Sequence, residues 1–508
     1  MSKASAIKTA NSRAKSSQES IWTRFETKEG AKNTAARSPG KKPPQRHLRW
    51  VVDAVLPLTL SVVTAIAVLL PISLPSEARL SLFAFALAVI LWSTTSLNAA
   101  YVALAAMMLL ILTGGSSQEQ LYEALASDVV WLMIGAFVLG ASVQQTGLAA
   151  RLTQLVVTRA GTVGSVFWLL TTMLIPLSFF IPSTSGRAAV VIPIFHTIAK
   201  AAGDRRITRA LAILMPTVIL VATITTLIGA GSHLVANDLL YQIAKQRLSF
   251  TQWLLYGLPF GIVASYLSCW VIMRLFLDKS HLKRELQIKQ TQHQPLSRSE
   301  WKTLLVISLM VALWLTESWH GFEIATITVA GALLLTAPSI GVISWKDGLK
   351  AVSWNLVIFV GAALVLGRAL IESGAAKWII DQMFGVTGIV GTESRLVILL
   401  FLSFISLTSH IYMTSHTARA AALVPALLYL GSSLQLNPVA VLFISTVGMD
   451  YCLTFPVSSK ALLMFQELEG ETYQPSDLLR LSAVLLLVHL GLMVLFYYGY
   501  WRWVGLAL

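Results

Sequence analysis

The sequence predicts an all-α polytopic membrane protein with about 11 transmembrane helices, arranged as two inverted repeats that each contain a re-entrant hairpin and a broken helix. Of its 508 residues, 56% are hydrophobic and 12% are charged, whereas an ordinary soluble domain has roughly 25% charged residues. Many uncharged runs are long enough to cross a bilayer, and the two halves of the chain carry matching segments. These three observations decide the fold class.

The uncharged runs set the number of crossings, because a helix needs roughly 20 apolar residues to span the hydrocarbon core. Residues 54–72 form one run, and residues 80–118 form a run too long for one crossing, which must turn near residues 94–98. Ten further apolar runs lie between residues 129 and 501. One leading helix and five crossings in each repeat account for them if the two hairpins are re-entrant.

The positive charge is concentrated in the first 49 residues, which hold twelve Lys and Arg against three Glu, or nine of the net +14. We therefore expect a disordered, lipid-touching cytoplasmic tail rather than a nucleic-acid-binding protein. About the first 30 residues contain no signal-peptide pattern. Beyond the tail, fifteen Lys and Arg fall in loops assigned to the inside and seven in those assigned to the outside. This bias predicts a cytoplasmic amino terminus in a bacterial inner membrane.

The same patterns predict the organisation of the chain. We expect the tail at residues 1–49, a leading helix and first repeat at 50–277, a basic cytoplasmic linker at 278–302 and the second inverted repeat at 303–508. The two cysteines, Cys269 and Cys452, lie in apolar runs and are interpreted as small core residues.

Two pairs of segments carry the internal repeat. Residues 131–147 and 354–374 share their glycine and apolar rhythm at an offset of 227. Residues 182–193 read PSTSGRAAVVIP and residues 414–425 read TSHTARAAALVP, which match at an offset of 232. Inverted repeats of this kind are common in secondary transporters.

The second pair of segments has the composition of hairpin tips that bind an anion. Irregular backbone inside a membrane must line protein or a watery cavity, and an arginine at a helix amino terminus favours a negatively charged ligand. The predicted ligands are Ser183, Thr184, Ser185 and Arg187 in one half and Ser415, His416, Thr417 and Arg419 in the other. The alternative is that the arginines pair with buried groups or reach the interface.

Two further interruptions, at residues 229–233 and 455–460, are typical of broken helices. Ser232 and Ser459 align at an offset of 227, and with His233 and Lys460 they complete the predicted substrate site. His233, His410, His416 and Asp450 are candidates for proton coupling, with hydrogen-bonded packing as the alternative for each.

The chain resembles the divalent anion:sodium symporter family, the dicarboxylate and sulfate transporters, over roughly residues 50–505. That family has Ser-Asn-Thr ten residues before a proline, where this chain has Ser183-Thr184-Ser185 before Pro193 and Ser415-His416-Thr417 before Pro425. The resemblance implies an elevator-like transport domain, a homodimer and sodium sites. Such sites would lie near Ser183, Gly229, Ser415 and Ser458. Both asparagines are missing and an arginine follows each motif, which makes exchange or proton coupling an alternative to sodium coupling.

These observations predict a secondary transporter that moves di- or tricarboxylates by alternating access and has no cofactor other than a coupling sodium ion or proton. Alternatives are a sulfate or other oxyanion permease, and a proton-coupled or exchange antiporter independent of sodium. A cation/proton antiporter would need buried carboxylates, and only Asp450 qualifies. Intramembrane enzyme motifs are absent from the sequence, and a receptor would leave the duplicated hairpins unexplained.

Overall fold

The computed structural model describes residues 46–508 apart from 71–73, 96, 149–150, 152–158, 287–294, 377 and 379–393. Nearly all of the predicted tail at 1–49 lies outside the described residues. Within them the backbone is helical, and the pairing of Thr162 with Glu285 is an isolated bridge rather than a strand. Residues 56–508 belong to one unit, which contains every element discussed below except the first part of the helix Arg46–Leu69. The predicted all-α fold class is therefore confirmed.

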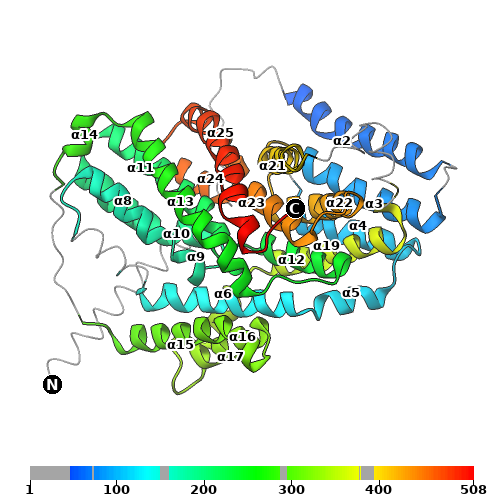
Figure 1. The fold of residues 1–508 in the computed structure, drawn as a ribbon, viewed down its shortest axis with the longest axis horizontal. Helices are drawn as coiled ribbons and strands as arrows, with labels where there is room; N and C mark the ends of the chain where they lie inside the picture. The colour runs from blue at the N-terminus through cyan, green and yellow to red at the C-terminus, as the bar shows by residue number, and fades with distance from the viewer. Residues whose placement is uncertain are drawn as a thin grey trace, which may run out of the picture. The chain divides into compact units, whose positions relative to one another are not determined.

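One group of helices, which we call the framework, is built around two packed pairs. In one pair α6 lies beside α17, and in the other α4 lies beside α19 (Figure 1). The predicted turn at residues 94–98 is confirmed, because α3 ends at Thr94 and Asn98 caps α4 by accepting a hydrogen bond from the Ala100 amide at 2.9 Å. The framework comprises α3 (Ser76–Thr94), α4 (Ala99–Leu112), α5 (Gln118–Leu125), α6 (Asp128–Thr146), α15 (Arg298–Leu315), α16 (Glu317–His320), α17 (Ile324–Thr336), α18 (Trp345–Lys350) and α19 (Trp354–Glu372).

The second group, which we call the site bundle, contains both hairpins and both broken helices. The chain passes from α9 to α10 through residues 181–183 and from α21 to α22 through residues 413–415. The site bundle comprises α8 (Val163–Leu174), α9 (Leu177–Phe180), α10 (Thr184–Ala202), α11 (Arg205–Val221), η1 (Ala222–Thr225), η2 (Leu227–Gly229), α12 (Gly231–Ala244), α13 (Phe250–Phe276), α14 (Lys279–Lys283), α21 (Arg395–Tyr412), α22 (His416–Ser433), α23 (Pro438–Asp450), η3 (Pro456–Ser458), α24 (Lys460–Gln466), α25 (Pro475–Gly499) and η4 (Trp501–Val504).

The repeat predicted from the glycine rhythm is visible in the backbone. A short helix precedes a 19-residue helix in each half, as α5 precedes α6 and α18 precedes α19. Gly147 follows α6 with φ 82° and Gly374 lies just beyond α19 with φ 77°. Both values are in the left-handed region, which glycine adopts without steric cost. The two glycines therefore end equivalent helices.

The described helices agree with the predicted number of crossings. Eight helices are long and apolar enough to cross a membrane, and four shorter apolar helices, including the part of α2 (Arg46–Leu69) from residue 55 on, accompany them. Two of the eight, Val163–Phe180 and Arg395–Tyr412, are hairpin arms. The remaining six and the four shorter helices are candidates for crossings by length and composition, close to the predicted number of about 11.

Burial separates central from peripheral helices. The apolar stretch Arg205–Thr225 is 94% buried, whereas that of Pro475–Gly499 is 39% buried. Large apolar side chains such as Leu487 and Leu495 are exposed on α25. Both helices are apolar enough to cross a membrane, so it is the buried fraction that distinguishes a helix enclosed by protein from one that faces lipid. The first broken helix is therefore the centre of the site bundle.

The predicted linker at 278–302 is partly ordered against the first hairpin. The Val163 amide donates to the Arg284 carbonyl at 3.0 Å, and the Leu286 amide donates to the Gly161 carbonyl at 3.2 Å. The helix α15 begins at Arg298, within the predicted linker range. The part of the linker that precedes residues 287–294, which lie outside the described part of the chain, therefore contacts the start of the first hairpin through its backbone.

The broken helix packs on α13 at a distance that requires glycine. A Cβ atom at Gly257 would lie 2.2 Å from the Ile224 carbonyl oxygen, whereas a Cβ atom at Gly491 on α25 would meet nothing within 4 Å. We expect Gly257→Ala to lower the unfolding midpoint in detergent, because overpacking a core contact costs about 1–3 kcal/mol. The matched control Gly491→Ala should keep or raise the midpoint. Equal midpoints for the two variants would contradict this packing.

Candidate functional site

The two hairpin tips share one local geometry. Ser183 Oγ caps α10 by accepting a hydrogen bond from the Gly186 amide at 3.2 Å, and it lies 3.0 Å from Ser185 Oγ. Ser415 Oγ caps α22 by accepting from the Ala418 amide at 3.3 Å, and it lies 3.3 Å from Thr417 Oγ1. An N-cap hydroxyl satisfies a backbone donor that the helix leaves unpaired. The alternating hydroxyls of the two motifs therefore build matching helix starts.

The two helix breaks are also equivalent, but in a different register from the predicted one. In the first break, extended residues Thr226 and Ala230 flank η2; in the second, extended residues Phe455 and Ser459 flank η3. These pairs match at an offset of 229, so the predicted match of Ser232 with Ser459 at 227 is wrong. The reason is that Ser459 is the N-cap of α24, whereas Ser232 lies inside the first turn of α12.

Arg187 extends from the first hairpin into the first break. It is 0% exposed, and its Nη2 donates to the Gly229 carbonyl at 2.8 Å and to Thr223 Oγ1 at 3.2 Å. Gly229 is required at this point, because a Cβ atom there would lie 2.2 Å from the Thr223 carbonyl oxygen. Arg187 therefore joins the hairpin tip to the unwound segment of the same repeat.

Arg419 makes the equivalent contact in the second repeat. It is 0% exposed, and its Nη2 donates to Cys452 Sγ at 2.6 Å. Cys452 and Thr223 are equivalent at the offset of 229 that relates the two breaks. Each arginine therefore uses the same nitrogen to bind the side chain at the same repeat position, which supports a shared role for both.

Both arginines have unused hydrogen-bonding capacity. Nε and Nη1 of Arg187 and of Arg419 are buried and have no hydrogen-bond partner among the described residues. Within the same part of the chain, neither guanidinium lies in an ion pair with a carboxylate, although Asp450 interacts electrostatically with Arg187. Burying a charged group without a counter-charge costs several kcal/mol. The donors and the charge are available to a ligand with negatively charged oxygens.

Exchange of elements between the repeats brings these groups together. The hairpin helix α22 packs against α12 of the first repeat, and α10 packs against α24 of the second. A Cβ atom added at Gly231 would lie 3.5 Å from Thr417 Cγ2, so the second hairpin tip touches the first break. His416 interacts electrostatically with Arg419, His233, His410 and Arg187. The predicted ligands from both repeats thus converge around His416.

Not every predicted ligand is at this centre. Lys460 is exposed at the start of α24, and Thr184 at the first hairpin tip is half-buried. Ser459 Oγ caps α24 by accepting from the Ala461 amide at 3.3 Å. The buried hydroxyl of Ser232 has no hydrogen-bond partner in the described chain, which leaves it open to a ligand.

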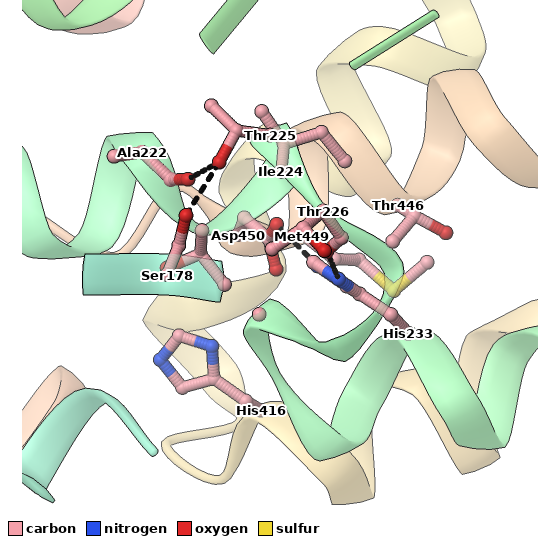
Figure 2. A network of polar contacts seen from close by, with 12 residues as sticks. Ser178, Ala222, Ile224, Thr225, Thr226, His233, His416, Thr446, Met449 and Asp450 are labelled. Atoms are coloured by element: carbon pink, nitrogen blue, oxygen red, sulfur yellow. Dashed lines mark hydrogen bonds and ion pairs between the residues drawn. The ribbon is translucent and has the colours of Figure 1, made fainter. Parts of the chain in front are cut away.

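A buried hydrogen bond between His233 and Asp450 joins the two broken helices. His233 Nε2 lies 2.7 Å from Asp450 Oδ2, and His233 Nδ1 lies 3.1 Å from the Thr226 carbonyl oxygen. Figure 2 shows the imidazole between Thr226 and Asp450, with His416 on a neighbouring segment. The imidazole also lies against the Trp253 ring, with centroids 4.7 Å apart. Two of the four candidates for proton coupling are therefore direct partners.

The third candidate, His410, is held separately. Its Nδ1 lies 2.7 Å from the Leu407 carbonyl oxygen and its Nε2 lies 2.6 Å from Thr454 Oγ1. The fourth, His416, has its Nε2 at 3.2 Å from Cys452 Sγ. Cys452 thus lies between His416 and Arg419, so its interpretation as a simple core residue misses these contacts. An apolar run around a cysteine gives no signal for such partners.

The residues expected near a sodium ion offer few unused oxygens. The Gly229 carbonyl accepts from Arg187, and the Ser183 and Ser415 hydroxyls cap their helices. Ser458 Oγ is buried without a hydrogen-bond partner in the described part of the chain. Three of the four oxygens therefore already accept a hydrogen bond, whereas the Ser458 oxygen has no partner among the described residues.

A second polar region lies at the carboxyl end of α12. A cavity of about 480 Å³ is lined there by residues of α5, α6, α12 and α19. Arg247 contacts Asp128 of the framework at 2.6 Å and Asp238 of the site bundle at 3.5 Å. Local periodicity gives no signal for the Arg247–Asp128 pair, because the two residues are 119 positions apart along the chain.

Curated proteins similar to this chain include several membrane transporters. A "Membrane protein" of Cupriavidus necator is 28% identical over 74% of this chain and 74% of its own length. The sodium-dependent dicarboxylate transporter SdcS of Staphylococcus saprophyticus is 24% identical over 72% of this chain and 76% of its own length. The citrate/succinate antiporter of Escherichia coli K12 is 24% identical over 73% of this chain and 78% of its own length.

The fold has a counterpart among solved structures. The YdaH transporter of Alcanivorax borkumensis, described as having an unusual topology, superposes with a TM-score of 0.56 over 85% of this chain and 100% of its own, at 15% identity. Residues 51–507 match the family described as the sodium:sulfate symporter transmembrane region. With nearly every described helix inside that match, the chain belongs to this family of secondary transporters of small anions.

Proposed function

We propose that this protein carries di- or tricarboxylates across the membrane by alternating access, with Arg187 and Arg419 as the anion-binding groups. The observation that carries the proposal is the pair of buried guanidiniums, each with two nitrogens that have no partner among the described residues. A guanidinium offers two parallel N–H donors to a carboxylate or another oxyanion. Two such groups suit a ligand with two or more negative charges.

The hairpin tips supply the rest of the proposed site. Ser185 and Thr417 are half-buried beside the two capping serines. Two helix amino termini add partial positive charge at the same place. Relatives named for dicarboxylate transport and for citrate/succinate exchange favour carboxylates over the sulfate of the family description. The protein would thus act by binding and moving its substrate, without chemical conversion.

We propose further that anion movement is independent of sodium. The Arg187 Nη2 donates to the Gly229 carbonyl, one of the oxygens expected to bind sodium. Two unit charges about 4 Å apart interact by about 4 kcal/mol at an effective dielectric constant of 20. A second cation beside either guanidinium would therefore be unfavourable, and exchange or proton coupling is the alternative that the charges support.

The larger assembly follows from the family resemblance. We propose a homodimer in which the site bundle moves against the framework, in a bacterial inner membrane with the amino terminus in the cytoplasm. The Arg247–Asp128 contact joins the two helix groups and would break during such a movement. The excess of positive charge in the loops assigned to the inside supports the orientation.

We expect Arg187→Gln and Arg419→Gln to weaken the binding of citrate or succinate, measured as anion-dependent thermal stabilisation and as uptake into proteoliposomes. A hydrogen bond to a charged group contributes about 1.5–3 kcal/mol, so affinity should fall about tenfold to a hundredfold. Arg206, which pairs with Asp278 away from the site, provides the control variant Arg206→Gln. Wild-type affinity in both site variants would contradict the proposed role, and stabilisation by sulfate alone would reassign the substrate.

We expect uptake of the preferred anion to be the same when external sodium is replaced by potassium or choline. The fixed charges of Arg187 and Arg419 replace those of coupling ions, so sodium would have no favourable site between them. Counterflow against an internal anion pool should raise the initial rate under both conditions. A saturable dependence on sodium would show that Ser458 and its neighbours hold the ion despite the arginines.

A further inference from the structure

The hydrogen bonds of His233 determine where its protons lie. The Thr226 carbonyl oxygen, 3.1 Å from Nδ1, can only accept, so Nδ1 carries a hydrogen. Asp450 Oδ2 lies 2.7 Å from Nε2, a hydrogen-bond distance that requires one proton between these two atoms. The pair is therefore either imidazolium with carboxylate or neutral imidazole with carboxylic acid. In both forms it holds one shared proton and has no net charge.

Removing that proton has a defined electrostatic result. Nε2 of His233 and the carboxylate oxygen of Asp450 would then be two acceptors that face each other with no hydrogen between them. The pair would carry one negative charge. His233 is 0% exposed and Asp450 is 4% exposed, so water does not screen this charge. Asp450 Oδ1 is buried and has no hydrogen-bond partner in the described chain, and Asp450 interacts electrostatically with Arg187. The new negative charge would act on that arginine.

We propose that the His233–Asp450 pair is a proton-binding site whose occupancy controls the anion affinity of Arg187. With the proton bound, the pair is neutral and the positive charge of Arg187 is available to the substrate. When the proton leaves to water, the Asp450 carboxylate neutralises that charge and repels the anion. Anion and proton therefore bind cooperatively, and each transported anion moves with a proton. This inference rests on the proposed function of Arg187.

The other ionisable groups around the pair are consistent with one titrating unit. His416 on α22 interacts with His233, and Arg419 of the same helix and His410 on α21 interact with His416. The α13 helix contributes Trp253, which is not ionisable. The charged residues of α6, α12 and α19 that line the 480 Å³ cavity, such as Asp128 and Asp238, belong to the other end of α12. The pair's own carboxylate is thus the acidic group facing Arg187.

The repeat relation shows that the pair is a specific addition to the site. At the offset of 229, the positions equivalent to His233 and Asp450 are Leu462 and Val221. Neither can hold a proton, whereas both arginines and both groups of hairpin hydroxyls are duplicated. The anion-binding groups occur in both repeats, whereas the His–Asp pair occurs in one. We therefore assign the pair a task other than anion binding. Proton binding provides such a task.

The test measures anion and proton movement together in proteoliposomes. Succinate uptake and internal pH are recorded at about pH 7 to 8, where both carboxyl groups of succinate are ionised. Wild-type protein should acidify the lumen as succinate enters, and its succinate affinity should fall as the pH rises. Succinate entry without acidification, and with unchanged affinity, would overturn the proton site while leaving the arginine site intact. Absence of flux for succinate, citrate and sulfate overturns both proposals.

Asp450→Asn provides the decisive variant, because its amide can donate to Nε2 of His233 as the protonated acid does. This variant should bind succinate with affinity independent of pH and should carry it without acidification. Asp238→Asn and His489→Gln change a buried acid and a buried histidine elsewhere and should keep the wild-type pH dependence. His233→Gln keeps the Asp450 carboxylate but removes the imidazole that shares its proton, so it should show the low succinate affinity of the deprotonated pair with little dependence on pH. Wild-type pH dependence in either site variant, or folded Asp450→Asn without succinate binding, would overturn the proposal.

Discussion

Two buried guanidinium groups, each with two nitrogens that have no partner among the described residues, constrain the rest of this structure. Arg187 and Arg419 are fully enclosed, and each donates one nitrogen to the break in its own repeat. Such charges are stable in a protein interior only when a partner or ligand compensates for lost hydration. The unwound backbone, the capped hairpin tips and the central position of the first broken helix all serve to hold these groups. In the proposed function, the bound anion supplies the negative charge that compensates these two arginines.

Duplication explains how the fold produces this arrangement. Each repeat supplies one capped tip, one arginine and one break, and the packing of α22 on α12 and of α10 on α24 joins elements of different repeats. Unwound backbone in a membrane is tolerated where protein surrounds it, and the close approach of Gly257 to the Ile224 carbonyl shows how tightly α13 covers the first break. The same packing that satisfies the backbone therefore positions the ligands.

The sequence predicted the elements of this site better than the contacts between them. Polar interruptions of apolar runs located both tips and both breaks, and the arginine positions followed from the hairpin motif. The offset of the breaks was misjudged because the match relied on two serines, whereas the backbone relates Ala230 to Ser459. The partnership of His233 with Asp450 joins residues 217 positions apart. Neither that pairing nor the contact of Cys452 with Arg419 leaves a trace in local periodicity, because both depend on how the repeats pack.

The charges of the proposed site also indicate why an empty carrier would move poorly. With the shared proton on the His233–Asp450 pair, the two arginines leave the unloaded site with two uncompensated positive charges. A dianion neutralises them, so the loaded form is the one suited to a low-dielectric environment. Loss of the proton leaves one positive charge uncompensated instead of two, which eases the return of the unloaded form. Exchange and proton-linked transport are then two consequences of one charge balance, and the ionisation of a single buried pair decides between them.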